Sequence, residues 1–572
     1  MSSTTSHFHW IDWIVLIGYF AITMSIGGYF YRKTRSTEGY TAANRSLPGW
    51  VCGLSIFATF LSSISYLALP GKSFASNWNP FVFSLSLPLV TWIAIRYFLP
   101  YYRKNGEVSA YAALESRFGL WARIYGSIFY LLTQVARVAV VMYLMALPMQ
   151  VIFGWNVYTI LIVTGVCVTL YSFAGGILAV IWTDAIQALV LMTGAMICVV
   201  VMLATIPGGP NEIFRVAAEN DKFSLGHLGI TVFDNGIVSV DLGAATFLVV
   251  LLYGIAINLQ NFGIDQSYIQ RYIAASSDQE ARRSLWLGGL LYVPVSALFF
   301  FIGTTLFAYY QTGDVQEVKA VVARQKLLQK GMSPNGPEFT EEQTILAQSL
   351  KASDVGDRVF PHFIAKRLPP GMTGLLIAAV FAAAMSTIST SLNSSATLIL
   401  RDYYQRLLNP EASERASMFV LYGATVVWGG LGTGLAFLLV QLTDSALDIW
   451  WTLSGIFGGG ITGLFLLGLI SRRAKNPAAV LGVIIGVIVI LWLSIPKTVT
   501  YLTAFPEETA FHRFGMILGQ SVQGWVSPFH AYMVPVFGTL TIFLVGVVVS
   551  SVFGAKGPTK QTETSLLDNN AT

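Results

Sequence analysis

A stripe of hydroxyl side chains runs through the apolar segment 381–397, which reads FAAAMSTISTSLNSSAT. Ser386, Ser389 and Thr390 are spaced i, i+3 and i+4, so they share one face of a helix, and Thr387 lies beside them. Several neutral oxygens without a charged neighbour suit a hard monovalent cation, which prefers oxygen ligands. The stripe therefore predicts a cation site on this helix.

A second apolar segment, 57–71, reads FATFLSSISYLALPG and carries hydroxyl side chains and a Pro-Gly pair in its middle and at its end. Lipid offers no partner for the backbone groups that such a break frees, so an interrupted span is tolerated where it lines a cavity. We expect backbone carbonyls around Ala58 and Leu61 to complete the cation shell. The carboxylate of Asp184 is expected to serve a neighbouring cation site.

Arg137 and Asp184 are the two ionisable residues that we expect deep inside apolar segments, where charges are costly and usually functional. The Arg137 guanidinium matches a carboxylate as a bidentate fork, which predicts a clamp on an anionic solute. Structural interpretations stay open: Arg137 bonding to helix carbonyls, Asp184 near the start of its helix, and hydroxyls that only pack helices closely.

These residues require membrane-spanning elements to position them. The chain is 54% hydrophobic and only 11% charged, whereas soluble proteins carry about 25% charged residues. Apolar runs of about 20 residues indicate a polytopic membrane protein. The predicted spans are thirteen: 10–30, 48–70, 79–100, 124–150, 156–174, 180–205, 243–263, 285–310, 371–399, 417–441, 447–470, 477–495 and 531–553.

The second and seventh predicted spans are both interrupted. The seventh, 243–263, contains YGIAINLQNFG, with Asn258, Gln260, Asn261 and Gly263. Five crossings separate the two spans, and an odd number inverts the second copy relative to the first. Paired interrupted spans at matching positions point to the midplane site of a secondary transporter.

Four motifs carry a resemblance to a known family: SIFATFLSSISYLALPGKSF, YSFAGGILAVIWTDAIQ, NFGIDQSYIQRY and GLLIAAVFAAAMSTISTSLNSSATLILRDYY. The chain resembles the sodium:solute symporter family over roughly 10–553. The resemblance implies an all-α LeuT-like fold with a five-plus-five inverted repeat, and alternating access driven by sodium, with no organic cofactor. It implies one extra span (10–30), a first repeat (48–205), a second repeat (243–470) and two further spans (477–553).

The resemblance also implies site residues. Family ligands of the main sodium site match the carbonyls of Ala58 and Leu61, with Ala383, Ser386 and Thr387. A further sodium site of the bacterial sialic-acid members matches Asp184, Ser386, Ser389 and Thr390. The expected solute contacts are Ser62, Ser65, Ser84, Arg137, Asn258 and Asn261.

The solute is expected to be an acidic sugar such as sialic acid, or another small organic anion, with a neutral sugar as the alternative. Ser84 departs from the sialic-acid members, which have an amide side chain there. Asn261 falls where sugar-carrying members have a gating tyrosine, and the span 285–310 lacks their lysine. A non-transporting sensor or a channel on the same fold is the alternative of another class.

Other classes are disfavoured. The loops contain no nucleophile elbow or His-based metal motif, which argues against an enzyme, and no GxxxxGK[ST] segment, which argues against a nucleotide-driven pump. The basic residues gather in loops between spans, so the net charge of +5 does not indicate nucleic-acid binding.

Lys and Arg concentrate in alternate short connections, 31–47, 101–123, 264–284, 400–416 and 471–476, which by the positive-inside rule are cytoplasmic. We therefore expect the N-terminus outside, the polar tail 554–572 in the cytoplasm and the long loop 311–370 outside, with a surface helix at 316–329. The protein is expected to be a monomer in the cell membrane.

Overall fold

The computed structural model shows a chain that is almost entirely helical. It describes residues 8–31, 36–232, 238–311, 315–329, 332–333, 336–442, 446–522 and 524–553. The predicted cytoplasmic tail 554–572 and the segment 32–35, which contains the basic residues Arg32, Lys33 and Arg35, lie outside the described residues.

Apolar helices dominate because a helix satisfies its own backbone hydrogen bonds where no water is present. The helices of the bundle are α1 (Trp10–Tyr31), α3 (Gly49–Phe60), α4 (Leu69–Ala75), α5 (Val82–Leu85), α6 (Leu87–Ile93), α7 (Leu99–Asn105), α9 (Leu120–Phe153), α10 (Val157–Thr205), α12 (Phe247–Ile264), α13 (Gln266–Ala274), α14 (Asp278–Gln311), α18 (Met372–Leu398), α19 (Glu414–Leu439), α20 (Ala446–Ile470), α21 (Asn476–Thr503) and α23 (Met533–Phe553). Tighter or wider turns join some of them: the 3₁₀ turns Ala43–Arg45 and Asn79–Phe81 and the π-helical segments Ile64–Ala68, Ala94–Phe98 and Ile399–Leu408.

The remaining elements lie in the connections. They are α2 (Thr37–Ala42), α8 (Ala112–Phe118), α11 (Pro210–Glu219), α15 (Val315–Gln329), α16 (Pro337–Ser349), α17 (Ala352–Arg367), α22 (Ala510–Ser521) and the antiparallel strands β1 (Ile230–Val232) and β2 (Val238–Val240). The predicted surface helix at 316–329 corresponds to α15, and the described residues of the loop 311–370 form two further helices, α16 and α17.

The predicted count of thirteen spans is not confirmed. Among the described residues, eleven helices are long and apolar enough to cross a membrane, and a bent pair, Gly49–Phe60 with Ile64–Ala75, makes a twelfth. The predicted span 156–174 corresponds to the shorter apolar helix Val157–Leu170. This segment and the next predicted span are both part of α10, which bends at Gly176, where φ is +55° and a Cβ would lie 3.0 Å from Tyr40.

The interruption of the seventh predicted span lies at a different place from the one expected. Helix α12 runs without a break through Asn258, Asn261 and Gly263 and ends at Ile264. The break is at Asp265, whose φ of −75° and ψ of 121° are extended and whose side chain caps the short helix α13. The amide-rich sequence therefore stays helical, and the polar segment that follows it forms a second, buried helix.

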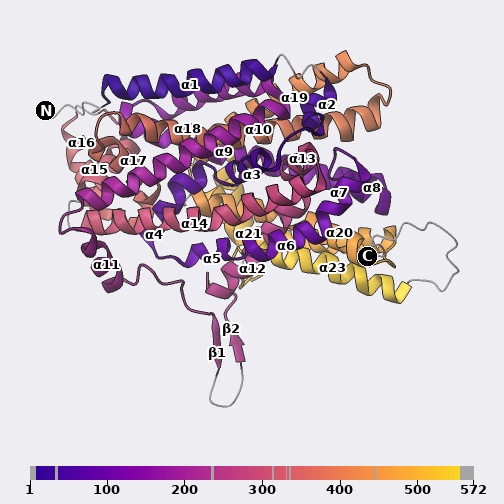
Figure 1. Cartoon of the computed structure of the whole chain (residues 1–572). Coiled ribbons are helices and arrows are strands. Elements are labelled where there is room, and N and C mark those ends of the chain that lie inside the picture. Colours follow the sequence, from indigo (N-terminus) through magenta and orange to yellow (C-terminus); the bar gives the residue numbers. More distant parts are fainter. Residues whose placement is uncertain are drawn as a thin grey trace.

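The connecting helices gather at the two ends of the bundle (Figure 1). Helices α11, α15, α16 and α17 lie at the end drawn on the left, and α2, α7 and α8 at the end drawn on the right. Helix α17 packs closely on α4, because a Cβ on Gly71 would lie 2.6 Å from the backbone of Gly356.

Burial separates the central helices from the outer ones. The apolar stretch of Met372–Leu408 is 94% buried, whereas that of Trp10–Phe30 is only 17% buried. Its high burial places the hydroxyl-rich helix α18 at the centre of the bundle, and α1 lies along the outer edge (Figure 1). A central helix can carry polar groups because protein, rather than lipid, surrounds them.

Candidate functional site

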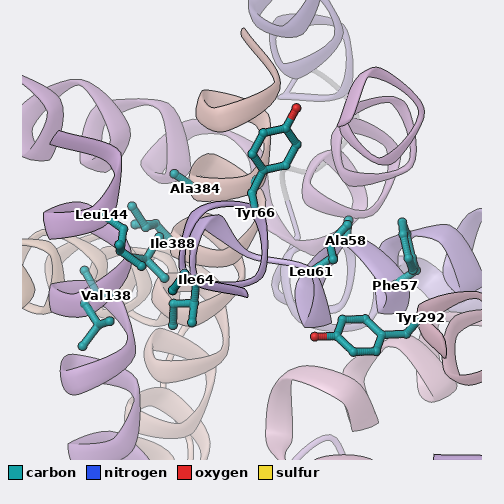
Figure 2. Close-up of a cluster of buried hydrophobic side chains, with 14 of the residues drawn as sticks. Phe57, Ala58, Leu61, Ile64, Tyr66, Val138, Leu144, Tyr292, Ala384 and Ile388 are labelled. Carbon is teal, nitrogen blue, oxygen red and sulfur yellow. The ribbon is translucent and has the colours of Figure 1, made fainter. Parts of the chain in front are cut away.

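The first broken helix opens its backbone beside α18. Helix α3 ends at Phe60, the π-helical turn begins at Ile64, and the two halves are bent by 57°. Leu61 has a non-helical ψ of 87°, and the Ser63 hydroxyl donates to the Val141 carbonyl of α9, 3.0 Å away. Figure 2 shows Ala58 and Leu61 on the first half of this segment and Ile64, on the turn that follows, close to Ile388 of α18.

Four of the five residues predicted for the main sodium site are joined by hydrogen bonds. The Ser386 hydroxyl donates to the Ala58 carbonyl and to the Ala383 carbonyl, at 3.2 Å each. The Thr387 hydroxyl donates to the Ala383 carbonyl at 3.1 Å. Leu61, the fifth residue, lies three positions after Ala58 at the end of the same helix. This set of neutral oxygens can coordinate a monovalent cation in place of its mutual hydrogen bonds.

The predicted second sodium site contains a residue that we did not expect. Arg271 of α13 forms an ion pair with Asp184, at 2.8 Å from Nη2 to Oδ2, and both side chains are fully buried. Nη2 also donates to the Thr390 hydroxyl at 2.6 Å, and the Ser55 hydroxyl donates to Asp184 at 2.7 Å. Ser389 makes a different contact, since its hydroxyl donates to a backbone carbonyl of α18.

A cavity of about 60 Å³ lies between the broken helix and α20. It is lined by predicted solute contacts and by aromatic side chains: Thr59, Phe60, Ser62, Ile64, Ser65, Leu69, Pro80, Phe83, Ser84, Arg137, Ile257, Asn261, Tyr268, Tyr292, Thr387, Leu447, Trp450 and Trp451. Thr387 belongs both to this lining and to the predicted main cation site. The cavity and that site are therefore in direct contact.

Arg137 lines the cavity. The sequence had led us to expect no acidic residue near it, but the structure shows one. Nη2 of Arg137 lies 3.4 Å from Oδ2 of Asp265, which is also buried, and its guanidinium lies 5.1 Å from the centre of the Trp450 ring. Its Nη1 is buried and has no hydrogen-bond partner among the described residues. The long single contact to Asp265 leaves much of the guanidinium available to an anion.

The prediction that Arg137 and Asp184 are the only ionisable groups deep in the bundle is therefore wrong. Asp265 and Arg271 follow directly after α12 in a polar stretch, IDQSYIQRY, that looks like a cytoplasmic loop by hydropathy. Both lie within the family motif NFGIDQSYIQRY, and their place in that motif was the sequence feature that could have indicated a functional role. Arg271 is 0% exposed, so it does not belong to the basic surface that we assigned to this connection.

Of the six predicted solute contacts, Asn258 is the one outside the cavity lining. Its Nδ2 donates to the Ser86 hydroxyl at 2.8 Å and to the Phe83 carbonyl at 3.3 Å, so it joins α12 to the junction of α5 and α6. Ser65 and Ser84 do line the cavity. Ser65 is 3.1 Å from the Tyr292 hydroxyl, and the Ser84 hydroxyl is 2.9 Å from another serine hydroxyl on α14.

Aromatic side chains form a wall of the cavity that sequence reasoning missed. The rings of Phe60 and Tyr292 are 4.3 Å apart and edge-to-face, and Phe60 also packs near Tyr268. Figure 2 shows Tyr292 close to the end of the first half of the broken helix. Aromatic residues are so common in these spans that spacing alone did not single them out. Together with the hydroxyls they form the mixed surface that binds small organic solutes.

Comparison with known proteins identifies the family to which this architecture belongs. The family model described as the sodium:solute symporter family matches residues 40–486. The sodium/sialic acid symporter of Proteus mirabilis is 33% identical over 488 residues, covering 85% of this chain and 89% of that protein. Human sodium-coupled monocarboxylate transporter 1 is 25% identical over 582 residues, covering 95% of this chain and 87% of that protein.

A solved structure of a sodium-coupled sialic acid symporter, substrate-bound and outward-open, matches with a TM-score of 0.76 at 28% identity. The match covers 97% of this chain and 100% of that one. It confirms the predicted fold class, an all-helical membrane protein of the LeuT type. The hydroxyl-lined broken helix, the buried oxygen stripe and the family match lead to one conclusion: the chain belongs to the sodium:solute symporter family and is a multi-pass membrane transporter rather than an enzyme.

Proposed function

We propose that this protein imports an acidic sugar such as sialic acid together with sodium ions, by alternating access. The Arg137 guanidinium carries the proposal, because its Nη1 is buried beside the cavity without a hydrogen-bond partner among the described residues. A carboxylate provides the charge-assisted hydrogen bonds that this group lacks. The name of the 33%-identical relative, a sodium/sialic acid symporter, supports the same solute.

The sodium ligands are proposed as two sets. The main site consists of the carbonyls of Ala58 and Leu61 with Ala383, Ser386 and Thr387. This set is supported by the hydrogen bonds that Ser386 of α18 donates to the Ala58 carbonyl on the broken helix and to the Ala383 carbonyl on α18. A sodium ion at this site links the broken helix to α18, because each of them contributes oxygen ligands. The second site consists of Asp184, Ser386, Ser389 and Thr390.

A smaller carboxylate is the second candidate for the solute. Nη1 of Arg137, which has no hydrogen-bond partner among the described residues, would bind the carboxylate of a short monocarboxylate as well as that of a sugar acid. The 25%-identical relative is a sodium-coupled monocarboxylate transporter.

The finer arrangement in the membrane belongs to the same proposal. The N-terminus and the helices α15, α16 and α17 face the outside, the connections around α2 and α8 face the cytoplasm, and the protein acts as a monomer in the cell membrane. The repeats are 48–205 and 243–470, with 10–30 and 477–553 outside them. Support comes from the basic connections and from the clustering of connecting helices at the two ends (Figure 1).

The proposal is tested by sodium-stimulated uptake into proteoliposomes of labelled N-acetylneuraminate, lactate and galactose, each with wild type and Arg137→Gln. We expect sodium-dependent uptake of N-acetylneuraminate by the wild type and its loss in the variant. Preferred uptake of lactate supports the second candidate. Preferred uptake of galactose that survives Arg137→Gln contradicts an anionic solute, and no uptake of any solute supports a sensor.

A further inference from the structure

Arg271 makes an unusually complete set of contacts for a buried arginine. Its Nε donates to the Ser55 hydroxyl at 2.7 Å, and its Nη2 contacts both Asp184 and Thr390. Its Nη1 donates to the backbone carbonyl of Ser267. The side chain has no exposed surface, and its contacts join α13 to α3, α10 and α18.

Two of these contacts use oxygens of the proposed second sodium site. Oδ2 of Asp184 and the hydroxyl of Thr390 are both within 2.8 Å of the same guanidinium nitrogen. A sodium ion bound to these two oxygens would lie beside a positive charge in a dry interior, where like charges repel strongly. Oδ1 of Asp184 is buried and has no hydrogen-bond partner within the described part of the chain. The carboxylate therefore still has one oxygen to offer to an incoming cation.

Helix α13 connects this cluster to the solute cavity. It spans only Gln266–Ala274, and all of its residues are buried. Asp265, which caps its first turn, is the residue that contacts Arg137 in the cavity. Helix α13 therefore carries Arg271, the partner of Asp184, on its second turn. It begins directly after Asp265, which contacts Arg137.

We propose that Arg271 is a built-in competitor of sodium at Asp184. Without sodium in the second site, the guanidinium neutralises the buried carboxylate. A sodium ion that binds there displaces Arg271, the shift of α13 withdraws Asp265 from Arg137, and Arg137 becomes free to bind the solute carboxylate. This inference rests on the proposed function and assigns Arg271 as a positioning residue that couples the second cation to the anion.

The test is sodium binding to the purified full-length protein, followed by intrinsic tryptophan fluorescence and by thermal stability in NaCl against choline chloride. Arg271→Gln keeps hydrogen-bonding capacity but removes the charge. We expect it to raise the sodium affinity of the second site, at Asp184, about tenfold or more, the usual effect of removing a neighbouring unit charge from a buried carboxylate. A merely structural arginine predicts an unchanged or lower affinity, and that result overturns the proposal.

Arg123→Gln is the matched control. Arg123 is also a buried arginine that pairs with a buried carboxylate, at 2.7 Å from Asp402, but it lies away from the proposed sites. We expect sodium affinity to stay unchanged in this control. An increase equal to that of Arg271→Gln overturns the specific role of Arg271.

Arg271→Lys keeps the inference testable if the glutamine variant does not fold. An ammonium group is a single point charge and cannot contact Ser55, Asp184 and Thr390 together. We expect sodium affinity to rise in this variant too, by a smaller factor, and an unchanged affinity contradicts the proposal.

Solute binding separates this inference from the proposed function. Sodium should raise the affinity of the wild type for N-acetylneuraminate, and Arg271→Gln should show high affinity at lower sodium concentrations. If the wild type binds the solute with sodium but Arg271→Gln leaves both affinities unchanged, the inference fails alone. If the wild type binds no solute in sodium, the proposed function fails.

Discussion

The Ser386 hydroxyl contacts two backbone carbonyls of the proposed main sodium site, one on α3 and one on α18. Ser386→Ala removes one ligand but leaves the volume nearly unchanged, so the protein should fold. We expect the apparent sodium affinity to fall by about tenfold, the equivalent of about 1.4 kcal/mol for one lost ligand. The measurement is the sodium dependence of solute uptake.

Ser391→Ala is the control for this prediction. Ser391 lies on the same helix and is equally buried, but its hydroxyl has no hydrogen-bond partner among the described residues. Its sodium dependence should match the wild type. A normal sodium dependence in Ser386→Ala would remove Ser386 from the ligand set.

Arg137 and Asp265 give the second prediction at this scale. Arg137→Lys should lower solute affinity by about tenfold or more, because an ammonium group cannot form the bidentate pair that a guanidinium forms. Asp265→Asn should raise solute affinity, because the competing carboxylate of Asp265 is removed and an amide oxygen can still cap α13. Equilibrium binding of labelled N-acetylneuraminate measures both. Lower affinity in Asp265→Asn, with the fold intact, would show that the solute does not replace Asp265.

The hydroxyl stripe of α18 was predictable from the sequence. The ion-pair partners of Arg137 and Asp184, which are Asp265 and Arg271, were not. The i, i+3, i+4 spacing of Ser386, Ser389 and Thr390 marks one helix face whatever the tertiary structure. Asp265 and Arg271 are buried because other helices enclose the short polar helix α13 and the residue before it. Hydropathy averaged along the sequence does not detect enclosure by distant segments. Which buried charges pair is likewise a property of three-dimensional packing.

At the scale of elements, the two broken helices differ in kind. The first is opened within its apolar run at Leu61 and is bent by 57°, as the hydroxyls and Pro70 suggested. The second stays helical to Ile264 and breaks at Asp265, where the apolar run ends. Amides such as Asn258 can bond to neighbouring helices without opening their own backbone, which explains why the amide-rich sequence misplaced the break.

Helix α17 contains a buried titratable group outside the spans. Nδ1 of His362 is 2.7 Å from the Tyr310 hydroxyl, its Nε2 is 3.7 Å from Glu317, and Arg367 also approaches Glu317. Burial lowers the pKa of His362 to about 4. The unfolded chain binds this proton near pH 6.5, so the folded state should lose stability as pH falls from about 6.5 to about 4.

The measurement for this prediction is the thermal unfolding midpoint of the detergent-solubilised protein at pH 7 and pH 4.5. We expect the wild type to lose about 2 °C through this group. His362→Gln can still bond to Tyr310 but cannot titrate, so part of the loss should disappear. An identical loss in wild type and variant would show that His362 does not contribute.

At the scale of the whole molecule, connecting helices gather at the two ends of the bundle, and the proposed orientation, which follows the basic connections, puts these ends on opposite sides of the membrane. Single cysteines in a Cys52→Ala, Cys167→Ser, Cys198→Ala background test the assignment. A cysteine at Glu341 should react with an impermeant maleimide added to intact cells. A cysteine at Arg472 should react only after permeabilisation, and the opposite pattern would invert the orientation.

Energy coupling is the central claim, because a carrier, a channel and a sensor can all possess this cavity. With two sodium ions for each monoanion, each cycle carries a net positive charge, so both the sodium gradient and the membrane potential should drive uptake. The most direct measurement is the internal concentration of labelled N-acetylneuraminate in proteoliposomes with an inward sodium gradient, with and without gramicidin. The account predicts accumulation above the external concentration, lost when gramicidin collapses the gradient. Equilibration to the external level, unaffected by the gradient, would contradict it.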